Sequence, residues 1–148
     1  MCWHCSLRLG NGAYCVITKR LYNEYNEYIM VWTMWKVITT DRFDQWFFEQ
    51  EPDLQDELLA AFLVLKREGP LTGRPLVDTL KNSKYPNMKE LRLSFEGKPI
   101  RDLFAFDPIR QAVFLCAGDK TGDKKFYQTY IKIADREFKI HLKKLEDK

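Results

Sequence analysis

The sequence predicts an α+β domain in which one strand and two helices precede three consecutive strands and a final helix. Apolar residues recur at every third or fourth position in two long stretches, which is the period of an amphipathic helix. Between these stretches, three strand-like runs are separated by hairpin-length turns, which predicts an antiparallel meander. The order is therefore β-α-α-β-β-β-α. We expect a small, mainly antiparallel sheet with the helices packed on one face.

The first strand leads into a helical hairpin. MWKVIT, residues 34–39, is apolar and β-branched, as strands commonly are. Thr40 and Asp41 supply an N-cap for the first helix. Pro52 suits the first turn of the second helix, and Gly69-Pro70 ends it. The apolar faces comprise Phe43, Trp46 and Phe47 in the first helix and Leu54, Leu58, Ala61, Phe62 and Leu65 in the second.

A long connection separates the hairpin from the meander. Residues 69–87 are rich in Gly, Pro and Asn, which predicts a loop of a length that is often functional. MKELRLSF, PIRDLFAF and QAVFLCA then form the three strands, with EGK and DPIR as turns. In the first of these strands, alternation places Leu91, Leu93 and Phe95 on one face and Glu90, Arg92 and Ser94 on the other.

The final helix is predicted from about residue 123 to residue 146. We expect Gly118 to let the chain leave the last strand and Asp123 to cap the helix. The apolar stripe comprises Phe126, Tyr130, Ile133, Phe138, Leu142 and Leu145. Cations gather at the C-terminal end, where they suit the helix dipole.

Composition excludes several classes of protein. The chain is 45% hydrophobic, which is sufficient for a packed core. Its net charge is only +3, so composition alone does not indicate a nucleic-acid binder. No run approaches the roughly 18 apolar residues of a membrane span, and a signal-peptide pattern is lacking, so we expect a cytoplasmic protein. Cys2, His4, Cys5 and Cys15 lack a second pair of metal ligands, and we expect incidental thiols and no metal or cofactor.

The stretch GDKTGDKKFY, residues 118–127, resembles a phosphate-binding loop at first sight. It departs from the Walker pattern because its glycines are four apart, Asp123 follows the second glycine, and Lys124 is followed by Lys125 instead of Ser or Thr. In a meander, however, the end of the third strand lies beside the start of the second and the end of the first. Cations and an aromatic residue would then converge on one sheet edge, where they could hold phosphate. They are Arg92, Arg101, Lys120, Lys124, Lys125 and Tyr127; a solvated basic face is the alternative.

A family resemblance bears on this choice. The combination ELR…G…IR…F.FDP.R…L..GDK…FY, with DRFDQWF and GPLTGRPLVDTLKNSKYPN before it, resembles the RelE/ParE superfamily of toxins from toxin–antitoxin systems. The similarity is to the HigB-like, phage-protein-related branch and covers residues 34–145. It implies a RelE-like microbial RNase fold and endoribonucleolytic cleavage of messenger RNA on the ribosome. It also implies neutralisation by a cognate antitoxin, often of the helix-turn-helix type, and no small-molecule cofactor or membrane partner.

The resemblance implies metal-independent chemistry, in which the ribose 2′-OH attacks the adjacent phosphate to give a 2′,3′-cyclic phosphate. Arg101 matches an arginine suited to the phosphorane charge, and Arg92 a basic position that binds phosphate or lowers the pKa of a neighbour. Lys120 matches a basic position near the leaving oxygen, and Tyr127 a tyrosine used in orientation, stacking or proton transfer. Further RNA- or phosphate-binding candidates are Lys89, Arg110, Lys124 and Lys125.

The resemblance does not identify the general base. The best-known RelE pattern has two lysines where this chain has Glu90 and Arg92, and neither His4 nor His141 is suitably placed. Glu90, Asp119 or Lys124 could take the role. A ParE-like inhibitor of DNA gyrase without nuclease activity remains an alternative, as does a non-toxic interaction module.

The first 33 residues differ in pattern from the rest. Residues 1–33 show no sustained periodicity and contain the tandem repeat NEYNEY. Relatives in this branch begin at a methionine like Met34. We therefore expect a toxin domain over 34–148, preceded by an extension that comes from an upstream start codon or from intergenic sequence. Mass analysis of the natively expressed N-terminus tests this expectation.

Overall fold

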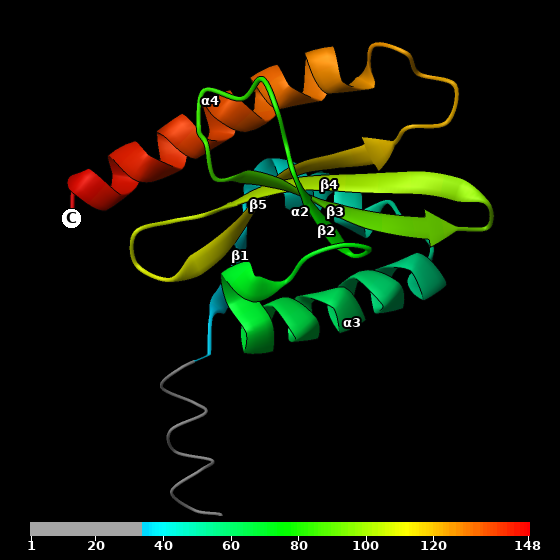
Figure 1. Cartoon of the computed structure of the whole chain (residues 1–148), viewed down its shortest axis with the longest axis horizontal. Helices are drawn as coiled ribbons and strands as arrows, with labels where there is room; N and C mark the ends of the chain where they lie inside the picture. The colour runs from blue at the N-terminus through cyan, green and yellow to red at the C-terminus, as the bar shows by residue number, and fades with distance from the viewer. Residues whose placement is uncertain (1–33) are drawn as a thin grey trace, which may run out of the picture. The chain divides into compact units, whose positions relative to one another are not determined.

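A computed structural model of the chain describes residues 34–148 (Figure 1). The expectations for the N-terminal cysteines and for the extension lie outside the described residues. The elements, in chain order, are β1 (Lys36–Thr39), α2 (Asp41–Phe48), α3 (Pro52–Glu68), the 3₁₀ turn η1 (Gly69–Leu71), β2 (Val77–Thr79), β3 (Met88–Phe95), β4 (Lys98–Phe106), β5 (Gln111–Asp119) and α4 (Phe126–Glu146).

One mixed sheet organises these elements, with the strand order β1-β5-β4-β3-β2. β3, β4 and β5 form the expected antiparallel meander, and β1 pairs with β5 in the parallel direction. The prediction of an α+β fold with a mainly antiparallel sheet is confirmed. The long connection is not all loop, because Val77–Thr79 adds an antiparallel edge strand on β3. This strand is too short for a period-2 pattern to reveal it in a sequence.

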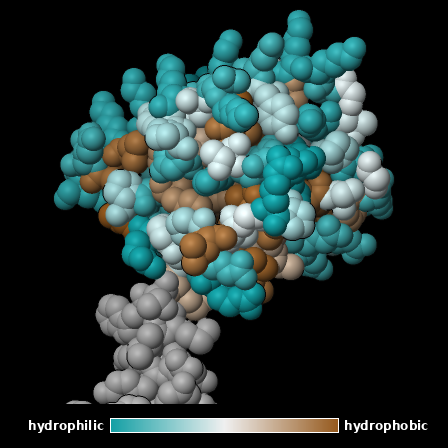
Figure 2. Space-filling model, in the orientation of Figure 1, coloured by the Kyte–Doolittle hydropathy of each residue, from teal (hydrophilic) through white to brown (hydrophobic). Residues whose placement is uncertain are grey.

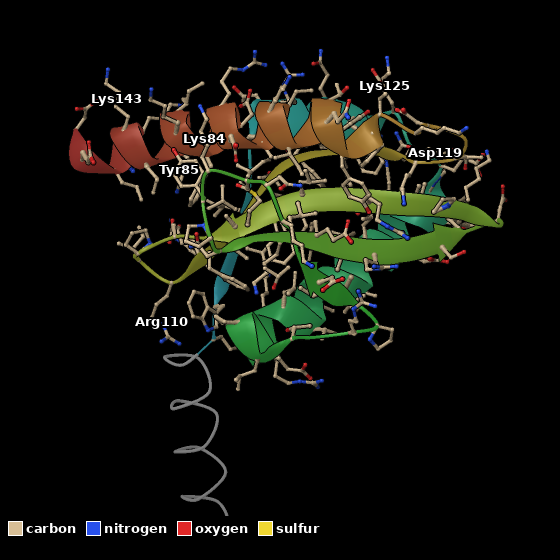
Figure 3. The ribbon with its side chains drawn as sticks, turned by 45° about the horizontal axis from the view of Figure 1, so that its top comes forward. Lys84, Tyr85, Arg110, Asp119, Lys125 and Lys143 are labelled. Atoms are coloured by element: carbon tan, nitrogen blue, oxygen red, sulfur yellow. The ribbon has the colours of Figure 1, made fainter. Side chains whose placement is uncertain are left out.

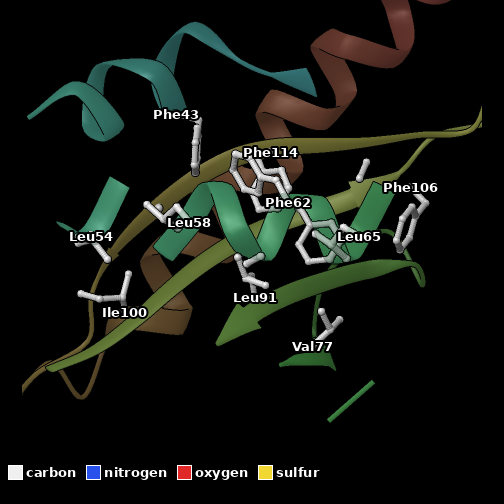
Figure 4. Packing of buried hydrophobic residues seen from close by; sticks show 14 residues of the cluster. Phe43, Leu54, Leu58, Phe62, Leu65, Val77, Leu91, Ile100, Phe106 and Phe114 are labelled. Atoms are coloured by element: carbon white, nitrogen blue, oxygen red, sulfur yellow. The ribbon is translucent and has the colours of Figure 1, made fainter. Parts of the chain in front are cut away.

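The helices cover both faces of the sheet, so the expectation of helices on one face is wrong. On one face, Phe43 of α2 and Leu58 of α3 belong to the same buried cluster as Phe114 of β5 (Figure 4). On the other face, Phe138 of α4 packs in a cluster with Leu115 of β5. The physical reason is that β5 is buried along almost its whole length and presents apolar side chains on both faces. A strand of that kind needs cover on each side.

The helix ends follow the expected signals at the N-terminal side of the fold. The Thr40 hydroxyl accepts a hydrogen bond from the backbone N–H of Phe43 and caps α2. Pro52 is the first residue of α3, and Gly69 ends that helix at a φ of 56°. A β-carbon at Gly69 would lie 2.2 Å from the Trp35 ring, so this turn needs glycine for space as well as for conformation.

The segment before α4 differs from the expectation. The helix begins at Phe126, and the carboxylate of Asp123 accepts a hydrogen bond from the Lys125 backbone in the preceding turn instead of capping the helix. Gly118 lies within β5 and does not end it. A β-carbon there would lie 2.6 Å from the Tyr130 hydroxyl oxygen, so Gly118 allows α4 to approach the strand closely.

Candidate functional site

The sheet register gathers the basic residues at one edge. Arg92 of β3 is paired with Arg101 of β4, and Arg101 is paired with Gly118 of β5. Lys120 follows β5 directly, and its backbone N–H donates to the carbonyl of Pro99. The structure thus brings Arg92, Arg101 and Lys120 to the same end of the meander, as the strand order predicts.

A hydrogen bond from α4 to β3 lies at the centre of this cluster. The Tyr127 hydroxyl donates to Glu90 Oε2 over 2.8 Å, and Arg92 Nη1 lies 3.3 Å from Glu90 Oε1. The Lys120 ammonium stands 4.8 Å from the centre of the Tyr127 ring, a cation–π contact. Glu90 is 4% exposed, so its carboxylate is held between an arginine and a phenol and away from bulk water.

The environment keeps the Tyr127 hydroxyl protonated. Burial raises the pKa of Tyr127 above its ordinary value, and the hydrogen bond to Glu90 and the charge of that carboxylate raise it further. The nearby Arg101 guanidinium opposes this shift in the pKa but does not reverse it. Tyr127 is therefore a hydrogen-bond donor at neutral pH and does not act as a phenolate.

Arg101 is fixed by the backbone and still has a donor to spare. Its Nη1 donates to the carbonyls of Ile100 and Leu93, at 2.8 and 3.2 Å. Among the residues that the structure describes, its buried Nε has no hydrogen-bond partner. A preorganised guanidinium with an unused donor suits an anionic oxygen that arrives from outside.

Asp78 is a member of the cluster that the sequence did not reveal. It lies on β2, where its carboxylate pairs with Arg74 and lies 3.5 Å from Arg92 Nη1. The hydrogen bond from Arg74 is the main reason that the pKa of Asp78 is lowered. An acidic residue in an unrecognised edge strand gives no signal in a sequence. Together, Asp78 of β2 and Glu90 of β3 hold Arg92 between two carboxylates.

Asp119 is poorly suited to accept a proton. It is exposed, and Oδ1 accepts hydrogen bonds from the backbone and the hydroxyl of Thr121. These bonds lower its pKa and so make it a weaker base. Lys124 and Lys125 are exposed in the turn before α4. Lys125 lies at the same end of the sheet as Asp119 (Figure 3).

Two predicted phosphate-binding residues lie elsewhere. Lys89 donates to the Thr79 hydroxyl at the β2 edge, and its side chain alternates away from the face that carries Glu90 and Arg92. Arg110 lies in the turn between β4 and β5, at the opposite end of the sheet, with its guanidinium 4.7 Å from the centre of the Trp35 ring (Figure 3). We therefore remove both residues from the candidate site.

Over residues 34–148, three or more His, Cys, Asp and Glu side chains are nowhere grouped as metal ligands would be. Within that same range, each helix is too short or too polar to cross a membrane.

The family follows from comparison with known proteins. The model of the family described as "Phage derived protein Gp49-like (DUF891)" matches residues 45–139, which include every member of the cluster. The chain belongs to this family. Among the curated relatives of the chain are two proteins of Mycobacterium tuberculosis, named "Putative toxin HigB2" and "Putative toxin HigB3".

These two relatives confirm the HigB-like resemblance. The chain is 44% identical to the HigB2 protein over 72% of its own length and 54% of that protein, so it spans about half of this relative. It is 46% identical to the HigB3 protein over 68% of its own length and 87% of that protein.

Solved structures of toxins are similar to this Gp49-like chain at low sequence identity. The toxin–antitoxin complex RelBE2 of Mycobacterium tuberculosis is 17% identical, with a TM-score of 0.47, and covers 59% of this chain and 99% of its own. A mutant of the E. coli toxin RelE in the free state is 8% identical, with a TM-score of 0.49, and covers 68% of this chain and 99% of its own.

Proposed function

We propose that this Gp49-like protein is the toxin of a toxin–antitoxin system and acts as an endoribonuclease on messenger RNA at the ribosome, in the cytoplasm. A cognate antitoxin, of the helix-turn-helix type, neutralises it. The observation that carries the proposal is the Tyr127–Glu90 hydrogen bond, which is flanked by Arg92, Arg101 and Lys120. A carboxylate, a phenol and three cations gathered at one edge of the sheet are the groups that RNA transesterification needs.

The proposed reaction begins with removal of the proton from a ribose 2′-OH. This proton passes to the Tyr127 oxygen while the Tyr127 proton passes to Glu90 along the existing hydrogen bond. The 2′-oxygen then bonds to the adjacent phosphorus, and the bond from phosphorus to the 5′-oxygen breaks. The Lys120 ammonium protonates the leaving 5′-oxygen. The products are a 2′,3′-cyclic phosphate and a 5′-OH, and no metal takes part.

Arg101 stabilises the charge that develops on the phosphorane oxygens. Its unused Nε donor and its backbone-anchored Nη1 support this role, because a fixed donor needs no reorganisation as the charge grows. The Arg92 guanidinium lies against the carboxylates of Glu90 and Asp78. It therefore holds Glu90 in place as well as attracting the substrate.

The proposal is tested by inducing the chain in cells and mapping the 5′ ends of messenger RNA, together with a gyrase supercoiling assay. We expect cuts in phase with codons, and a loss of about 10²–10³-fold in cleavage for Arg101→Ala and Lys120→Ala. Arg110→Ala is the matched control, because this exposed arginine lies at the other end of the sheet. Intact messenger RNA with blocked supercoiling would establish a gyrase inhibitor instead. Unaffected growth would point to an interaction module.

A further inference from the structure

The outer face of α4 carries a narrow line of cations. We call Lys125, which directly precedes the helix, and Lys132, Arg136, Lys139 and Lys143 on it the α4 basic stripe. At 3.6 residues per turn, their spacing places them within about 60° of the helix circumference. Hydrophilic side chains cover this side of the molecule (Figure 2), and Lys125 and Lys143 mark the two ends of the stripe in Figure 3.

The cations of the stripe are available to a ligand. All five are exposed, and within residues 34–148 none of them is in an ion pair. The nearest acidic residues of the helix are engaged elsewhere: Asp135 is buried and accepts a hydrogen bond from Ser83, and Glu137 pairs with Arg42. The positive charge of the stripe is thus not neutralised by its own helix.

The opposite face of the sheet has the opposite charge. The segment 41–68, which forms α2 and α3, holds eight Asp and Glu but only three Lys and Arg. The segment 120–148, which includes α4, holds nine Lys and Arg and five Asp and Glu. Because α3 and α4 lie on opposite sides of the sheet (Figure 1), these two segments of the described domain place opposite net charges on its two faces, which favours the approach of α4 to a polyanion.

The stripe begins at the end of α4 that carries Tyr127 and leads away from the candidate site. Lys125 is two residues before Tyr127, and Lys143 is about 27 Å further along the helix axis at 1.5 Å per residue. A strand bound in the site could therefore continue along the helix. Of the apolar side chains on this face, Ile140 is the large exposed one, at 45%. Protein interfaces are typically depleted in Lys and anchored by aromatic groups, whereas phosphate contacts use Lys and Arg.

We propose that the α4 basic stripe binds the sugar–phosphate backbone of RNA beyond the cleaved position. This inference rests on the proposed RNA-directed function, since it extends the same site along α4. The contacts are to phosphates, so they add affinity that depends on salt and on RNA length but carry no sequence preference.

The test measures the binding of fluorescent 2′-O-methyl oligouridines, which cannot be cleaved, in two lengths of about three and about fifteen nucleotides. The stripe variant is Lys132→Gln/Arg136→Gln/Lys139→Gln. The control variant is Lys36→Gln/Lys66→Gln/Arg67→Gln, which removes the same charge from β1 and α3 and leaves α4 unchanged. Circular dichroism and melting temperature verify that both variants are folded.

We expect the stripe variant to lose about 10-fold or more in affinity for the long oligonucleotide at low salt, with little change for the short one. The slope of log affinity against log salt should fall in magnitude by about 2, because three cations contribute about 0.7 each on a single strand. Unchanged affinity, or an equal loss in the control variant, would overturn the proposal. Intact RNA binding with loss of antitoxin neutralisation would assign the stripe to a protein partner and also overturn it.

The cellular cleavage assay keeps this inference separate from the proposed function. If the wild-type protein cleaves messenger RNA but the stripe variant binds both oligonucleotides normally, only the stripe is refuted. If cleavage is absent while the length-dependent loss is seen, the stripe stands as an RNA-binding surface and the nuclease reaction is refuted.

Discussion

The Tyr127 hydroxyl donates a 2.8 Å hydrogen bond to Glu90 Oε2 and so joins two residues that are 37 positions apart. The bond fixes the start of α4 against β3 at the sheet edge where Arg92 and Arg101 are paired. It also couples the ionisation of the phenol to the charge of a buried carboxylate. The consequences of this coupling can be measured without a substrate.

Replacement of Glu90 by glutamine is expected to lower the pKa of Tyr127 relative to the wild-type protein. The carboxylate raises that pKa by its hydrogen bond and its charge, while burial persists in the variant. Tyrosinate absorbance measures the effect as the difference between Glu90→Gln and Glu90→Gln/Tyr127→Phe, which isolates this tyrosine from the others. An unchanged pKa would contradict the coupling.

Asp102 is expected to make the unfolding free energy fall as the pH rises. This carboxyl is fully buried, and in the described structure neither of its oxygens has a partner. Burial raises its pKa well above the ordinary value, and the charge of Arg101 opposes this only in part. Between the unfolded pKa of about 3.9 and the raised folded pKa, the folded state binds more protons. Stability is therefore full below that range and is lost by up to about 1.4 kcal/mol per pH unit across it.

The measurement is urea unfolding of the wild-type protein, Asp102→Asn and Asp56→Asn over a pH series. Asp102→Asn should remove this part of the pH dependence, because asparagine does not titrate. Asp56, an exposed residue of α3, is the matched control and should leave the curve unchanged. Parallel curves for all three proteins would show that Asp102 does not titrate as expected.

Gly118→Ala is expected to destabilise the fold by about 1–3 kcal/mol, as overpacking typically does. The new methyl group would lie 2.6 Å from the Tyr130 hydroxyl oxygen, so the ring must move off its stacked contact with Phe126. Thermal unfolding checks this, with Gly73→Ala as the control because a β-carbon there has no neighbour within 4 Å. Equal melting temperatures for the two variants would argue against the close approach.

Cys116 is expected to be inert toward thiol reagents while the protein is folded. Burial raises the pKa of its thiol to about 12, and the reactive species is the thiolate. Alkylation of the full chain followed by peptide mass spectrometry should find Cys116 unmodified until denaturant is added. Rapid labelling of Cys116 in buffer would show that the sheet opens locally around β5.

Sequence patterns predicted the parts of the fold that repeat over many residues. The stripe of α3 and the alternation of Leu91 and Leu93 each report burial on one face, and the structure confirms both. In β5 the apolar run is unbroken and shows no alternation. The sequence therefore does not reveal that Leu115 and Cys116 are buried on a second face of the sheet. The two-sided arrangement of helices could therefore not be read from the chain.

The sequence likewise predicts only part of the candidate site. The convergence of Arg92, Arg101 and Lys120 follows from strand order alone, since antiparallel neighbours of similar length have predictable registers. The inclusion of Asp78 depends on β2, and the exclusion of Lys89 depends on the face to which its side chain alternates. Arg110 lies in a turn at the far end of the sheet, and only three-dimensional placement removes it.

The parallel pairing of β1 with β5 has a consequence during synthesis. β1, the first strand of the described fold, cannot pair until β5, which ends at Asp119, has been synthesised. Tyr127 is synthesised later still. When β1 through β4 have left the ribosome, β5, which lies between β1 and β4, and the phenol of the site have not. The candidate site is therefore assembled only after β5 and the first turn of α4 have been synthesised.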